Sequence, residues 1–131
     1  MPNRHFLPMV AMCIVALPAA GRANVTQDTF LVRSTRDLVD LCAVAPDDPM
    51  AAAALNFCHG FGVGVYRVLE KVEMTRKARM YCPPSSNLTR NEAVARFVQW
   101  AKTNPDQLNQ PPQDGIVAFL SSQYPCIDKK H

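Results

Sequence analysis

The chain has 131 residues and a formal net charge of +3, from 14 Lys and Arg against 11 Asp and Glu. Arg4 and Arg22 fall in a leader-like start, so residues 24–131 carry 12 basic and 11 acidic side chains, a net charge of +1. This near neutrality gives no general case for binding nucleic acid or an anionic membrane surface. The remaining stretch, about 108 residues, is enough for one domain with a modest core.

Residues 1–23 have the pattern of a secretory signal peptide. Arg4 lies in a short basic start, residues 6–20 form a continuous apolar run, and small residues stand at −3 and −1 of a cleavage site after Ala23. The apolar run is too short to span a membrane comfortably. We therefore expect cleavage near Ala23 and a single exported helical domain over residues 24–131, with no membrane attachment after cleavage.

Two helices are expected in the first half of this domain. Ser34 begins the first, because its hydroxyl can cap the helix and Asp37 places an acid in the first turn. The second is the longest, from about Pro49 to about Glu73, with apolar residues at helical spacing. Asp48 can cap it, and a proline suits the first helical position because it has no amide hydrogen to leave unpaired.

Three glycines lie within this long expected helix, at positions 60, 62 and 64. Each costs about 1 kcal/mol relative to alanine in a helix interior. Gly60 and Gly64 are four residues apart and share one face, so we expect another helix to approach that face at backbone distance. A phosphate-binding loop is disfavoured, because no strand precedes the glycines and no Lys-Ser or Lys-Thr follows them.

Two more helices are expected in the second half. Thr89 and Glu92 form a capping-box pattern for the third, which ends before Pro105. Pro111 and Pro112 begin the fourth. With no alternating strand pattern of useful length, the expected fold is all-α, a small bundle of four main helices.

Four cysteines follow the leader: Cys42, Cys58, Cys82 and Cys126. An even number in a short exported domain predicts two disulfides. A zinc site is disfavoured by the export signal and by the absence of Cys-x-x-Cys pairs. Three pairings are possible. We expect Cys42–Cys58 and Cys82–Cys126, because crossed pairings would require more distant elements to meet.

No catalytic constellation is evident. His59 follows Cys58, but adjacent helix positions point in different directions, so the two cannot meet as base and nucleophile. Glu70 and Glu73 could pair as acid and base, yet the basic residues around them favour ordinary solvated charge. We therefore expect a protein that is not an enzyme and binds no metal or cofactor.

The order of the cysteine motifs resembles the Rap/Tai family of type VI secretion immunity proteins, over roughly residues 35–126. The resemblance rests on Leu41-Cys42, Cys58-His59-Gly60-Phe61-Gly62-Val63-Gly64, Cys82-Pro83-Pro84, Asn104-Pro105 and Pro125-Cys126. It implies a small periplasmic helical protein of Gram-negative bacteria that inhibits a peptidoglycan amidase effector, an NlpC/P60-like cysteine peptidase. Characterised members are typically homodimers and plug the groove of the enzyme with a protruding loop.

The matched motifs build the scaffold, so partner-binding residues are expected in exposed segments outside them. Two segments qualify, and the expected contact residues are Arg76, Lys77, Arg79, Gln113 and Asp114. The first three form a basic cluster that could orient binding to an acidic rim. The alternative for that cluster is a solvated helix end, where cations favour the helix dipole.

Two other functions remain open at this point. The same scaffold could serve as a small periplasmic chaperone or envelope-stress protein, or it could be an enzyme with an unrecognised site.

Overall fold

A computed structural model describes residues 24–75, 79–83 and 87–126 of the chain. These residues form helices and no strand, which confirms the expected all-α bundle. The elements are η1 (Gln27–Leu31), α1 (Thr35–Cys42), α2 (Ala51–Thr75), α3 (Arg90–Thr103), η2 (Pro105–Gln107) and α4 (Pro112–Gln123). The expected leader and its cleavage site at Ala23 lie outside the described residues.

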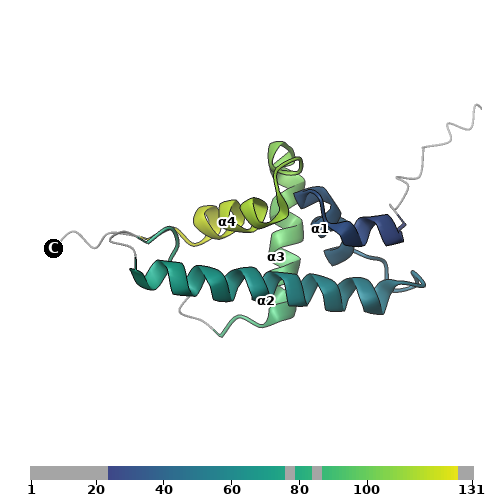
Figure 1. The fold of residues 1–131 in the computed structure, drawn as a ribbon, viewed down its shortest axis with the longest axis horizontal. Helices are drawn as coiled ribbons and strands as arrows, with labels where there is room; N and C mark the ends of the chain where they lie inside the picture. Colours follow the sequence, from purple (N-terminus) through teal and green to yellow (C-terminus); the bar gives the residue numbers. More distant parts are fainter. Residues whose placement is uncertain (1–23, 76–78, 84–86, 127–131) are drawn as a thin grey trace, which may run out of the picture.

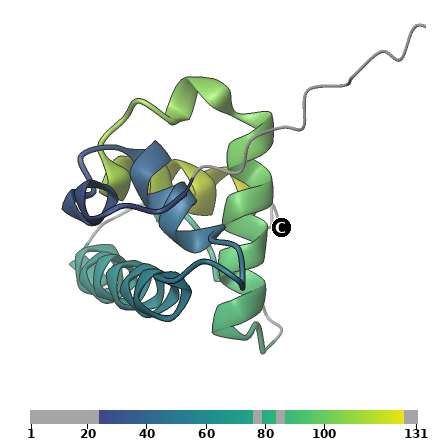
Figure 2. The same ribbon diagram turned by 90° about the vertical axis from the view of Figure 1, so that its right-hand side faces the viewer.

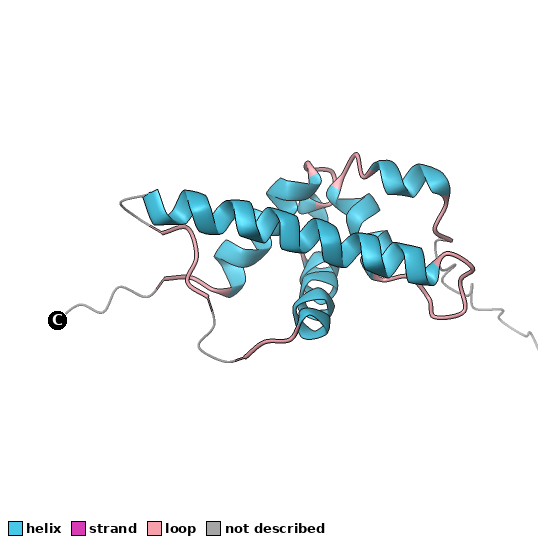
Figure 3. Ribbon diagram, turned by 60° about the horizontal axis from the view of Figure 1, so that its bottom comes forward, coloured by secondary structure: helices cyan, strands magenta, loops and turns pink. Residues whose placement is uncertain are grey.

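Helix α2 forms the long axis of the molecule (Figure 1). Helices α1 and α4 lie beside its two halves, and α3 crosses between them. Seen along α2, α3 runs across the bundle rather than parallel to it (Figure 2). Helix α1 packs against all three other main helices, so this eight-residue helix is the centre of the bundle. The described residues outside the helices are loops and turns (Figure 3).

The expected caps of α1 and α3 are present. The Ser34 hydroxyl accepts a hydrogen bond of 3.3 Å from the Asp37 amide, and the Asp37 carboxylate accepts one of 3.1 Å from the Ser34 amide. The capping box expected at the start of α3 is formed in the same reciprocal way. Helix α2 begins at Ala51, two residues later than expected, and the Asp48 carboxylate accepts the Met50 amide at 2.8 Å. Such small shifts are normal at helix ends.

The first turn of α1 is fixed by the loop that precedes α4. The Thr35 amide donates to the Gln110 carbonyl at 2.8 Å, and the Arg36 amide donates to the Leu108 carbonyl at 2.9 Å. The hydroxyl of Thr35 lies 3.0 Å from the Gln110 carbonyl oxygen. These contacts satisfy amides that a helix leaves unpaired at its start, so they join α1 to the other end of the domain.

Close packing at a glycine occurs at Gly115, whereas the close approach expected at Gly60 and Gly64 is not found among the described residues. A Cβ at Gly115 would lie 2.9 Å from the Cβ of Thr35. A Cβ at Gly60 or Gly64 would meet no atom of the described residues within 4 Å. Both of these glycines are exposed, because they lie on the outer face of α2.

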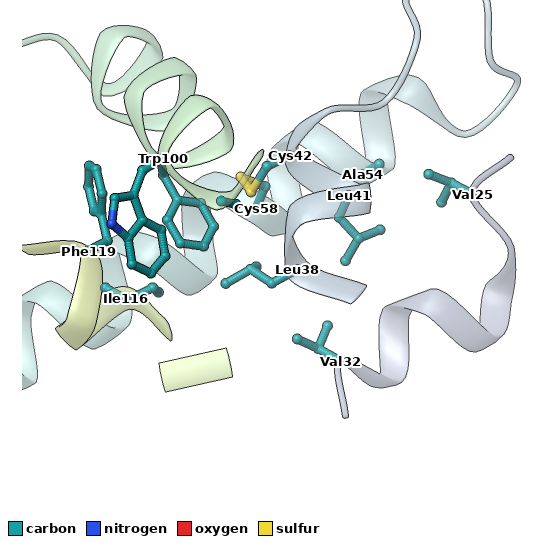
Figure 4. Close-up of a cluster of buried hydrophobic side chains, with 12 residues drawn as sticks. Val25, Val32, Leu38, Leu41, Cys42, Ala54, Cys58, Trp100, Ile116 and Phe119 are labelled. Carbon is teal, nitrogen blue, oxygen red and sulfur yellow. A yellow bond between two sulfur atoms is a disulfide. The ribbon is translucent and has the colours of Figure 1, made fainter. Parts of the chain in front are cut away.

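The core lies where α1 meets the other helices (Figure 4). Leu38 and Leu41 of α1 are its most buried large side chains. Three aromatic side chains extend the core. The ring centroid of Phe119 lies 5.5 Å from that of Phe97 and 5.8 Å from that of Trp100, both in edge-on geometry. Such pairs add about 0.5–1.5 kcal/mol beyond burial of their area.

Both disulfides have the expected pairing. Cys42–Cys58 joins the end of α1 to α2, with 5.2 Å between the Cα atoms. Cys82–Cys126 joins the segment after α2 to the chain after α4, with 4.9 Å between the Cα atoms. The Cys82 amide also donates to the Tyr124 carbonyl at 2.7 Å, which fixes the same two segments through the backbone.

Candidate functional site

A groove of about 530 Å³ lies between the four main helices, and residues 81, 83, 87–89 and 124 complete its described lining. Its lining is mostly apolar, and it reaches the core at residues such as Leu38, Phe97 and Phe119. Binding sites for small molecules are typically concave, apolar and of 300–1,000 Å³, with a few polar groups for orientation. This groove has the shape and chemistry of such a site.

The absence of a side chain at Gly62 leaves part of this groove open. Gly62 lines the groove, and a Cβ built there would meet no atom of the described residues within 4 Å. Two positions correspond to about 200° around an α-helix. Gly62 therefore faces nearly opposite to Gly60 and Gly64, which do not line the groove.

Two tyrosines lie at one wall of the groove. The ring centroids of Tyr66 and Tyr81 are 6.2 Å apart, and Tyr81 is buried. Burial, helped by the nearby Tyr66, Glu70 and Glu73, raises the pKa of Tyr81 to about 12. Burial and the charge of Glu70 also raise the pKa of Tyr66. Both hydroxyls therefore stay protonated at neutral pH and can donate hydrogen bonds.

Glu70 and Glu73 do not form an acid–base pair. The Glu70 carboxylate pairs with Arg67 at 2.7 Å on the surface. Glu73 is buried, and its Oε2 accepts the Met80 amide at 2.8 Å. Its Oε1 has no hydrogen-bond partner among the described residues. The expectation of solvated charge is therefore wrong for Glu73, which is buried and binds the backbone of Met80.

The charged side chains that line the groove are cationic. They are Arg67 and Arg90, and no Asp or Glu belongs to the described lining. The charge of Arg67 is balanced by Glu70. Arg90 is exposed at the first residue of α3 and has no ion-pair partner among the described residues. The groove thus has one uncompensated cation at its rim.

Of the residues expected to bind a partner, Arg79, Gln113 and Asp114 are described by the structure, and none of these three lines the groove. Arg76 and Lys77 lie outside the described residues, and Arg79 is exposed after α2. Gln113 and Asp114 are exposed in the first turn of α4. The hydrogen bond between Cys82 and Tyr124 places residues 79–83 near the other end of α4. At about 1.5 Å per residue that helix is about 18 Å long, so Arg79 is separate from Gln113 and Asp114.

Sequence reasoning did not identify the groove residues. One signal was available, because Gly62 interrupts the apolar spacing on the inward face of the long helix. No comparable signal marks Tyr66 and Tyr81, which come together only after the irregular segment has folded back.

The described residues contain no group of three or more His, Cys, Asp or Glu that could hold a metal ion. Cys58 is bonded to Cys42 and so cannot act as a nucleophile with His59. In the described part of the chain, no helix combines the length and apolar character needed to cross a membrane.

The chain is similar to the Rap1a immunity proteins, whose family model matches residues 34–126. The matched range contains all four main helices and both disulfides. No curated protein and no solved structure matches the chain significantly.

Proposed function

The chain belongs to the Rap1a immunity protein family, and from this premise we propose that it is a periplasmic inhibitor of a type VI secreted peptidoglycan amidase. The observation that carries the proposal is the family match over residues 34–126. Disulfides support export, because they persist mainly in oxidising compartments such as the periplasm. In this function the protein protects its own cell by binding the effector.

The groove supports binding rather than catalysis. Its described lining is largely apolar, its tyrosines are neutral, and Cys58 is held in a disulfide. Such a surface can bury an apolar part of a protein partner, and a few buried anchors carry most of the affinity in protein interfaces. We therefore include non-enzymatic inhibition in the proposal. The homodimer that we propose as the active form rests on the family alone.

The basic cluster remains a proposed contact with the amidase, and we call it the basic segment below. Arg76, Lys77 and Arg79 would steer the complex, since complementary charge mainly raises the rate of association. Gln113 and Asp114 would form a second, separate contact from the start of α4.

The proposal is tested by co-expression. Residues 24–131 would be directed to the periplasm of a bacterial host together with each candidate amidase effector from the same genome. We expect one amidase to cause lysis alone and to be neutralised by this protein. A cytoplasmic form without a leader is the control and should not protect. If no amidase is neutralised in cells, or inhibited by the purified protein on peptidoglycan, the proposal is wrong.

The open apolar groove also favours a second candidate, a small periplasmic chaperone. A chaperone would slow the aggregation of several unrelated unfolded proteins, whereas an immunity protein would act on one folded amidase. Light scattering during refolding of two unrelated secreted proteins separates these functions.

A further inference from the structure

We infer that the groove receives a short segment of the effector that carries an apolar side chain beside a carboxylate, with the carboxylate held at Arg90. This inference rests on the proposed function and deepens it, because it names the chemistry of the partner. It assigns this protein a receiving site in addition to any segment that it inserts into the enzyme.

The empty space at Gly62 is the first argument. Glycine within a helix costs about 1 kcal/mol relative to alanine, and packing inside the described chain does not explain that cost. A side chain at this position would project into the groove, since Gly62 belongs to its lining and has open space around its Cβ position. The glycine therefore keeps room that no described residue of the chain fills, and we assign this room to the partner.

The lining indicates what that group is. Apolar surface dominates the groove, and Val63, Val94 and Leu120 contribute half-buried side chains to it. An apolar side chain that enters would replace the water there and gain about 25 cal/mol for each Å² of apolar surface buried. A volume of about 530 Å³ is larger than one side chain requires, so a short segment is the appropriate occupant.

Charge selects the flanking residue of that segment. Arg90 is the cation at the rim that lacks an ion-pair partner among the described residues, and no carboxylate lines the described groove. A guanidinium binds a carboxylate through two parallel hydrogen bonds. A basic segment would instead meet the unpaired charge of Arg90, so charge complementarity favours an acidic one.

The first experiment fills the groove. Gly62→Phe is compared with Gly64→Phe, since both positions have open space in the same helix but only Gly62 lines the groove. The probe is anilinonaphthalene sulfonate, a dye with an aromatic body and an anionic group. We expect Gly62→Phe to reduce the dye fluorescence severalfold and Gly64→Phe to leave it unchanged. Thermal unfolding confirms that both variants are folded.

The second experiment uses the amidase that the wild-type protein neutralises. We expect Gly62→Phe to weaken inhibition by at least about tenfold, the loss typical of an interface hot spot. Arg90→Glu should do the same without disturbing the fold, because an acid is favoured in the first turn of a helix. The matched control is Arg36→Glu, an exposed position in the first turn of α1 that is not in the groove lining.

Several outcomes overturn the inference. Full inhibition by Gly62→Phe and Arg90→Glu would show that the effector does not use the groove. Equal losses in Gly62→Phe and Gly64→Phe would indicate a general effect on α2. A change of oligomeric state in Gly62→Phe alone, measured by light scattering, would show that a second copy occupies the groove. A wild-type protein that inhibits no amidase would reject the proposed function, and this inference with it, before any variant is compared.

Discussion

Gly115 of α4 lies directly against the side chain of Thr35 in α1, so that a Cβ at Gly115 would be 2.9 Å from the Cβ of Thr35. Thr35 is fully buried, and its hydroxyl lies within hydrogen-bond distance of the carbonyl oxygens of Gln110 and Pro111. The side chain is therefore held in place and cannot move aside for a larger neighbour. This contact sets the distance between α1 and α4.

A methyl group at Gly115 is expected to destabilise the fold. Gly115→Ala should lower the free energy of unfolding by about 1–3 kcal/mol, the usual cost of overpacking. Gly64→Ala is the matched control and should raise it by up to about 1 kcal/mol, because open space leaves only the gain in helix propensity. Urea unfolding of the oxidised proteins measures both. An unchanged midpoint for Gly115→Ala would show that α1 and α4 separate without cost.

The two disulfides are expected to differ in their rate of reduction. Cys42 and Cys58 are 8 % and 2 % exposed, whereas Cys82 and Cys126 are half-buried. A thiolate must reach a sulfur to reduce it, so mild dithiothreitol should open Cys82–Cys126 first. Timed alkylation and peptide mass mapping follow the order.

The denatured protein is the control for the order of reduction. In that state both disulfides should be reduced at the same rate. Permanent loss of either bridge, by Cys→Ala at both partners, should cost about 2–5 kcal/mol. Faster reduction of Cys42–Cys58 in the native protein would contradict the burial described for it.

Tyr81 is expected to ionise late. Its pKa is raised to about 12, chiefly by burial, so the folded protein holds this proton while an unfolded tyrosine loses it near pH 10. The unfolded state then binds fewer protons, and the stability falls as the pH rises from about 10 to about 12. Absorbance at about 295 nm, where tyrosinate absorbs, should show a late step that Tyr81→Phe removes. A late step that persists in Tyr81→Phe would contradict the assignment.

The basic segment is expected to act on the rate of binding. Replacing Arg76, Lys77 and Arg79 together by alanine should slow association with the neutralised amidase and reduce its dependence on salt. Dissociation should change little if these residues only steer. Stopped-flow binding at two salt concentrations measures both rates. Unchanged rates and salt dependence in a folded variant would exclude the segment and leave Gln113 and Asp114 as the remaining contact residues.

The four helices and both disulfides could be predicted because their signals are local. Ser34, Thr89 and Pro112 mark helix starts through groups within one turn of each other. The cysteine pairing followed from keeping each bridge near its own helical hairpin. The helix starts depend on short stretches of sequence, whereas Cys82–Cys126 joins cysteines 44 residues apart and was predicted by excluding crossed pairings.

The glycines and the groove could not be predicted in this way. Helical spacing shows that Gly60 and Gly64 share a face, but not whether anything lies opposite that face. The groove requires the four main helices and residues 81, 83 and 87–89 together. The Glu73 carboxylate accepts a hydrogen bond from the amide of Met80, seven residues later, and the residues next to Glu73 in the sequence do not reveal this contact.

The dependence of α1 on Gln110 also orders the folding of the chain. An eight-residue helix is not stable alone in water, and the residue that receives its first amide and its hydroxyl lies 75 positions later. A chain that emerges from the ribosome amino terminus first therefore cannot complete its core until most of the domain has been synthesised. The export that we propose would move an unfolded chain, which is compatible with this delay. The first turn of α1 is then completed only when the loop before α4 is present.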